Sequence, residues 1–193
     1  ALLALRVPPA ALVAAGRAIP GLGRRQVWFD FVSRFAFWHG VRGGSDRAGR
    51  RRVFRSVPVL MYHAFSEDGT RERYVMPRRA FARQMLALRL LRYRVIELGR
   101  LADALAAGNP LPNRAAVITI DDGYADNRAV ALPVLRRHRF PATLFLVSRR
   151  LGKRADWASD GGSTDGRPLL SAADAKRSLA AGATVGAHTR THP

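Results

Sequence analysis

Residues 115–123 read AAVITIDDG, an apolar run that ends in two aspartates and a glycine. An apolar run of this length indicates a strand, and the similar run at 142–147 is of the type that is buried on both faces of a sheet. The two carboxylates then fall at the carboxyl end of the strand, where α/β folds build their active sites. Gly123 permits the tight turn that follows. The stretch therefore predicts an α/β fold with Asp121 and Asp122 at its functional edge.

Around this stretch, residues 53–193 alternate between strand-like and helix-like segments, which we treat as one domain. Hydrophobic periodicity predicts strands at 57–62, 94–98, 116–120, 142–147 and 183–187, and helices at 77–93, 101–107, 127–138 and 172–181. Ser171 is expected to cap the last helix, and Pro133 to bend the helix at 127–138. This rhythm indicates parallel strands in a barrel or a doubly wound sheet.

The composition supports a globular core and restricts the chemistry. Hydrophobic residues make up 48% of the chain, and there is no cysteine, so any bound metal must be held by histidine and carboxylate. The net charge of +19 would suit nucleic acid, anionic membranes or acidic polymers. Because the cations are nearly all arginines and no nucleic-acid-binding motif accompanies them, we interpret the charge as a genome-wide codon bias and expect no nucleic-acid partner.

Residues 1–52 differ from the rest and form a basic, aromatic-striped segment with a linker. Trp28, Phe31, Phe35 and Trp38 recur at helical spacing. This pattern fits either a helix at 24–42 that lies on an anionic membrane or the packed tail of an upstream domain. The apolar run at 1–15 is too short and too interrupted for a membrane span, and it lacks the layout of a signal peptide. We interpret the chain as a fragment.

A second chemical motif follows the last expected strand. His188 and His192 are four residues apart, and we expect them on one side of a helical turn, where both imidazoles reach one ion. Together with the aspartate pair they would make a three-ligand metal site with a spare base, which is the chemistry of a metal-assisted hydrolase. The alternative is a capping aspartate pair with two surface histidines.

These residues resemble the polysaccharide deacetylases (the NodB-homology domain, carbohydrate esterase family 4). Residues 119–123 read TIDDG and are similar to the family's Thr-Phe-Asp-Asp-Gly motif, with Ile120 in the phenylalanine position. Residues 188–193 read HTRTHP and are similar to its His-Ser/Thr-x-x-His-Pro motif. Residues 58–63 and 140–145 resemble other strands of the family. The resemblance implies the N-terminal part of an incomplete, distorted (β/α) barrel, truncated after the second motif.

The resemblance also implies an activity and a set of roles. Asp121 would be the general base, while Asp122, His188 and His192 would bind a divalent ion, usually zinc. The substrate would be an acetylated carbohydrate polymer that loses N-acetyl groups, which favours the cell envelope or secretion. Because the imidazoles must be neutral to bind metal, activity should fall below about pH 6.

Three further residues are candidates for supporting roles. His63 is a possible second-shell partner or substrate contact, or else a structural histidine. Thr189 is within reach as a hydrogen-bonding partner of the site, although ordinary turn packing is the commoner role. Trp157 is a candidate for stacking on a sugar or is a half-buried aromatic. Two other functions stay open: a catalytically inactive carbohydrate-binding fragment, or part of a fused glycosyltransferase–deacetylase whose tail includes residues 37–42.

Overall fold

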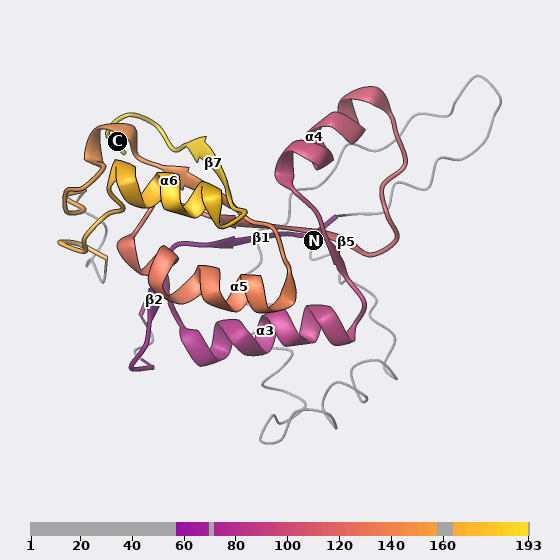
Figure 1. Cartoon of the computed structure of the whole chain (residues 1–193), viewed down its shortest axis with the longest axis horizontal. Coiled ribbons are helices and arrows are strands. Elements are labelled where there is room, and N and C mark those ends of the chain that lie inside the picture. Colours follow the sequence, from indigo (N-terminus) through magenta and orange to yellow (C-terminus); the bar gives the residue numbers. More distant parts are fainter. Residues whose placement is uncertain (1–56, 70–71, 158–163, 193) are drawn as a thin grey trace.

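The computed structural model describes residues 57–69, 72–157 and 164–192 (Figure 1). The basic segment at 1–52, with its predicted helix and membrane contact at 24–42, lies outside this range and stays a prediction. None of the helices in the described part is long and apolar enough to cross a membrane. The described residues therefore belong to the second expected domain, residues 53–193.

A parallel sheet forms the centre of the molecule. Its strands β1 (Val59–Tyr62), β5 (Ala115–Ile120), β6 (Thr143–Leu146) and β7 (Thr184–Ala187) lie in the order β1-β5-β6-β7, and β4 (Arg94–Val95) pairs with the start of β5. The register pairs Tyr62 with Ile120 and Leu146 with Ala187, so the strands end at a common edge. Every residue of β5 is buried, and β6 is buried at three of its four positions.

Helices cover the sheet and complete the core. The helices α3 (Arg78–Leu90) and α5 (Leu132–His138) run side by side along the sheet, and α4 (Leu98–Ala107) and α6 (Ala172–Ala180) complete the helical set (Figure 1). Phe81 and Met85 of α3 and Leu135 of α5 pack against Ile118 and Ile120 of β5 in the largest hydrophobic cluster. This parallel sheet with crossover helices is the architecture of part of a (β/α) barrel.

The predicted elements differ from the observed ones mainly at their ends. The expected strand at 94–98 is only two residues long, and α4 begins at Leu98. The expected helix at 127–138 divides into a π-helical segment, η1 (Asn127–Ala131), and α5, with Pro133 in the first turn of α5. Ser171 caps α6 as expected, in a reciprocal pair of hydrogen bonds with Asp174.

Three short elements have no counterpart in the sequence analysis. The strands β2 (Ala64–Ser66) and β3 (Val75–Pro77) pair in parallel as a separate two-stranded sheet. A single 3₁₀ turn, η2 (Ser148–Arg150), follows β6. Elements of three residues are too short to carry a recognisable hydrophobic period.

Candidate metal centre

The aspartate pair lies at the carboxyl end of β5, as the sequence predicts. The backbone N–H of Asp121 donates to the carbonyl of Tyr62 at 2.8 Å, which continues the pairing of β1 with β5. Asp122 and Gly123 then adopt φ values of +69° and +75°. A Cβ at residue 123 would lie 2.6 Å from Cδ2 of Leu146, so only glycine allows the turn to pack this closely on β6.

The two histidines follow β7, but the prediction that they share a helical turn is wrong. His188 is fixed by its N–H, which donates to the carbonyl of Leu146 at 2.8 Å. Residues 189–192 form an irregular loop in which Thr189 and His192 have φ values of +60° and +62°. Positive φ values do not occur in a right-handed helical turn, so the two rings converge through the loop.

Thr189 organises this loop. Its hydroxyl oxygen accepts a hydrogen bond from the backbone N–H of His192 at 3.0 Å, and its carbonyl accepts one from the N–H of Ser148 at 3.3 Å. A β-branched residue at positive φ is a strained arrangement that surrounding contacts must hold in place. Thr189 therefore supports the position of His192 from within the loop.

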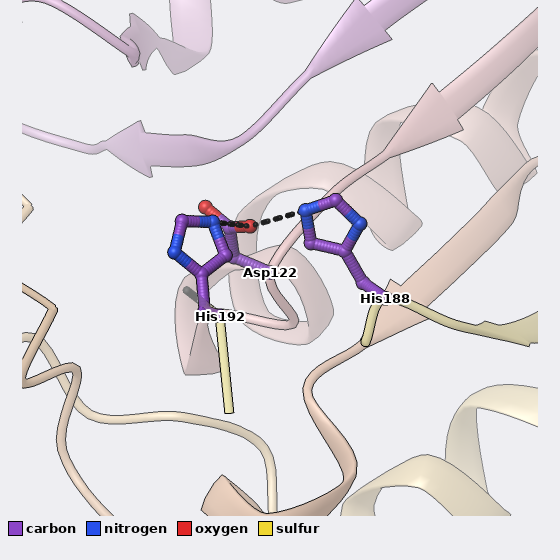
Figure 2. A group of neighbouring side chains, drawn as sticks. All are labelled: Asp122, His188 and His192. Carbon is purple, nitrogen blue, oxygen red and sulfur yellow. Dashed lines mark ion pairs between the residues drawn. The ribbon is translucent and has the colours of Figure 1, made fainter. Parts of the chain in front are cut away.

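Asp122, His188 and His192 converge on one point (Figure 2). Oδ1 of Asp122 lies 3.2 Å from Nε2 of His188 and 3.3 Å from Nε2 of His192. The three ligand atoms all lie within 4.8 Å of one another. Oδ1 of Asp122 is buried and accepts no conventional hydrogen bond, so the cluster has unsatisfied acceptor capacity. One oxygen and two imidazole nitrogens in this arrangement fit a divalent cation such as Zn²⁺.

Asp121 and His63 share the electrostatic environment of this cluster. Asp121 is 8% exposed, and its burial raises the pKa of its carboxyl group, while His63 and His188 act in the opposite direction. Burial lowers the pKa of His63 against the attraction of the Asp122 and Asp121 carboxylates. The structure thus brings Asp121 and His63 to the cluster from the adjacent ends of β5 and β1.

Trp157 does not present a ring face for a sugar, which corrects the stacking interpretation. Its side chain is only 8% exposed and belongs to a small buried cluster with Tyr124, Val147 and Leu169. The centroid of its ring lies 4.4 Å from that of His192, with 31° between the planes. Trp157 is therefore a packing partner of His192. It is buried, whereas the sequence analysis offered a half-buried aromatic as the alternative to stacking.

Two polar residues after the aspartate pair have roles that the sequence reasoning missed. The carboxylate of Asp126 makes no capping hydrogen bond to the following helix, and instead accepts from the N–H of Phe65 at 3.0 Å and from Arg167 at 3.1 Å. Asn127 donates through Nδ2 to the carbonyl of His63 at 2.6 Å. These contacts hold residues 63–65 beside the site. No local signal could reveal them, since the partners are more than 40 residues apart in the sequence.

Comparison with known proteins points to one family. The family model described as polysaccharide deacetylase matches residues 108–193, a range that contains the aspartate pair and both histidines. This segment of the chain is therefore similar to the polysaccharide deacetylases. The two motifs on which the resemblance rests lie within the matched range, whereas His63 precedes it.

Relatives of known sequence agree with this family. The chain is 29% identical over 98 residues to "Putative polysaccharide deacetylase YxkH" of Bacillus subtilis (strain 168), which covers 51% of this chain and 34% of that protein. It is 29% identical over 99 residues to "Poly-beta-1,6-N-acetyl-D-glucosamine N-deacetylase" of Escherichia coli (strain K12), which covers 51% of this chain and 15% of that protein. The chain thus spans about a third or less of the length of these deacetylases.

Solved structures share the fold. The chain aligns with IcaB from Ammonifex degensii at a TM-score of 0.59 and 29% identity, over 68% of this chain and 52% of that chain. The deacetylase PplD of Streptococcus pyogenes aligns at a TM-score of 0.57 and 21% identity, over 71% of this chain and 57% of that chain. The likeness to PplD is one of fold alone.

Proposed function

We propose that this chain is the metal-binding part of a hydrolase that removes N-acetyl groups from a polymer of N-acetylated amino sugars. The observation that carries the proposal is the convergence of Asp122, His188 and His192 on one point, with the buried carboxyl group of Asp121 beside them. The name of the Escherichia coli relative supports a β-linked N-acetylglucosamine polymer as the substrate class. Such a polymeric substrate favours a location in the cell envelope or outside the cell.

Asp122, His188 and His192 would hold the cation, and Zn²⁺ suits a donor set of one carboxylate and two imidazoles. When bound, the cation would supply a Lewis acid that polarises the amide carbonyl and lowers the pKa of water. The chain's own contribution is to keep the three ligands together: the β6–β7 pairing fixes His188, and the Thr189 hydrogen bond and the Trp157 ring fix His192.

Asp121 is the residue that we assign to proton abstraction. Its backbone is fixed by the β1–β5 pairing, and burial raises the pKa of its carboxyl group, which makes it a stronger base than an exposed aspartate. Asp121 precedes Asp122 in the chain, but it is not one of the three residues that could hold the metal ion. His63, which interacts electrostatically with Asp121, is the residue that we assign to substrate contact.

The test separates metal binding from catalysis. Zinc binding to the wild-type chain is measured by calorimetry, and acetate release is measured with N-acetylglucosamine oligomers and added zinc. We expect Asp121→Asn to lower the rate of acetate release by about 10²- to 10⁴-fold while zinc still binds. The matched control is Asp103→Asn, because Asp103 is an exposed aspartate on α4.

Each outcome has a distinct meaning. An unchanged rate in the Asp121→Asn variant would remove Asp121 as the base. Zinc affinity that is equal in the wild type and in Asp122→Asn would overturn the metal site itself. Binding of the oligomers without acetate release, unaffected by a chelator, would select the catalytically inactive carbohydrate-binding alternative.

A further inference from the structure

A basic pocket lies at the end of the sheet opposite to the metal centre, where β4 begins. Its volume is about 310 Å³. The walls come from the ends of α3 and α5, from β4, from the first turn of α4 and from the segments that precede β5 and β6. The cationic side chains that line it are Arg89, Arg94, Arg100, Arg139 and His138, and the aromatic walls are Tyr93 and Phe140.

The positive charge of this pocket has no acidic partner among the residues that the structure describes. No aspartate or glutamate of this part of the chain is among the residues that line the pocket. Within the described ranges, the ion pairs use other arginines, and none joins Arg89, Arg94, Arg100 or Arg139 to an acid. His138 senses the positive field, because its pKa is lowered first by burial and then by Arg137 and Arg89. The cationic side chains therefore give the pocket a positive potential, which favours an anion.

Ordinary helix capping accounts for only part of the cluster. Arg89 lies in the last turn of α3, and His138 and Arg139 end α5, where cations complement the negative end of the helix dipole. Arg100, however, lies in the first turn of α4, where the dipole disfavours a cation, and Arg94 extends from a strand. These two arginines therefore point to a ligand rather than to helix stability.

We propose that this pocket binds a phosphoryl anion, either free or carried at the end of a larger molecule. The guanidinium group is a planar fork that pairs with phosphate oxygens through two hydrogen bonds, and four such groups suit a ligand with several anionic oxygens. The volume lies at the lower end of the range for small-molecule sites, which suits a group of diphosphate size. This site requires neither the metal centre nor deacetylase activity.

The test uses the whole chain after metal has been stripped from it, so that the probe cannot bind through zinc. Sodium pyrophosphate is titrated by calorimetry at constant ionic strength, with sodium perchlorate as the reference anion. We expect the variant Arg94→Gln/Arg100→Gln to bind pyrophosphate at least tenfold more weakly than the wild type. The control is Arg79→Gln/Arg83→Gln, which removes the same charge from exposed positions of α3.

Further arms distinguish the source of the phosphoryl group. Vesicles that contain phosphatidate would compete with pyrophosphate if the natural ligand is a lipid headgroup, and a lack of vesicle binding would favour a free ligand. Arg94→Lys/Arg100→Lys keeps the charge but not the fork, and we expect intermediate affinity from it even if the glutamine variant does not fold. Equal affinity in the wild type, the pocket variants and the control, or no preference over perchlorate, would overturn the proposal.

Discussion

At the scale of single residues, the candidate site depends on backbone conformations that are costly in isolation. Asp122, Thr189 and His192 all have positive φ, although none is a glycine. Each such residue costs about 1–2 kcal/mol, so the surrounding contacts must hold them. Those contacts are the strand pairings on either side of β6, the hydroxyl of Thr189 and the ring of Trp157. Strain of this kind is common at functional sites.

The ring of Trp157 gives a test of this support at the metal centre. Because the ring packs on His192, we expect Trp157→Leu to lower zinc affinity by about tenfold through a less ordered imidazole. Trp157→Phe keeps an aromatic contact and should retain most of the affinity. Calorimetry measures both, and circular dichroism verifies that each variant is folded. Equal affinity in all three proteins would show that the ring serves packing alone.

At the scale of secondary-structure elements, the turn after β5 determines how the aspartate pair is presented. Gly123 combines positive φ with a close approach to β6. Gly152 also has positive φ, at +74°, but a Cβ there would meet only Ser171, at 3.8 Å. The two glycines therefore separate the cost of backbone strain from the cost of a steric clash.

We expect Gly123→Ala to lower the free energy of unfolding by roughly 2–5 kcal/mol, the sum of left-handed strain and overpacking against Leu146. Gly152→Ala should cost only about 1–2 kcal/mol, because strain acts there without a clash. Urea denaturation measures both values. Equal losses in the two variants would contradict the close packing of the turn on β6.

At the scale of the whole molecule, the metal centre connects strands that are not neighbours. Asp122 follows β5, and both histidines follow β7. The strand β6 lies between β5 and β7 in the sheet. An ion held by all three residues would therefore link the segments that follow β5 and β7, across the intervening strand β6. Ligands that bind only the folded state stabilise it by mass action.

Zinc should raise the melting temperature of the wild-type chain. At a free concentration a thousand times the dissociation constant, the stabilisation is about 4 kcal/mol. Differential scanning calorimetry with and without zinc measures the shift, and Asp122→Asn should abolish it. A shift of equal size in that variant would indicate that zinc binds elsewhere.

Two partly buried groups, His63 and Asp126, give the stability of the metal-free protein opposing pH dependences. The pKa of His63 is lowered from 6.5 by burial, so the unfolded chain binds more protons and stability falls as the pH drops below about 6.5. Burial raises the pKa of Asp126 from 3.8 to about 6, so the folded chain binds more protons between these values. This second effect increases stability as the pH falls from about 6 to about 4.

The variant Asp126→Asn should expose the contribution of His63. The amide oxygen can still accept the hydrogen bond from Phe65, but the proton uptake of the carboxyl group is lost. We therefore expect this variant to lose stability more steeply than the wild type between pH 6 and pH 4, by up to about 3 kcal/mol. Urea denaturation across this range measures the difference. Parallel profiles would contradict the raised pKa of Asp126.

Local sequence patterns were sufficient for much of the fold. The strand β5 was recognisable from its largely apolar run, and α6 was recognisable because its cap uses residues three apart. The short strands β2 and β3 and the π-helical segment were not, because they depend on pairing and packing rather than on a period of their own.

The sequence by itself determined the candidate site residues and that they follow predicted strands, because residue type and strand periodicity are local properties. Only the tertiary structure decided how they meet. It replaced the expected helical turn at 188–192 with a strained loop, buried Trp157 against His192, and used Asp126 and Asn127 to hold residues 63–65. These contacts join segments that are far apart in the chain, so their energies depend on packing that no local pattern encodes.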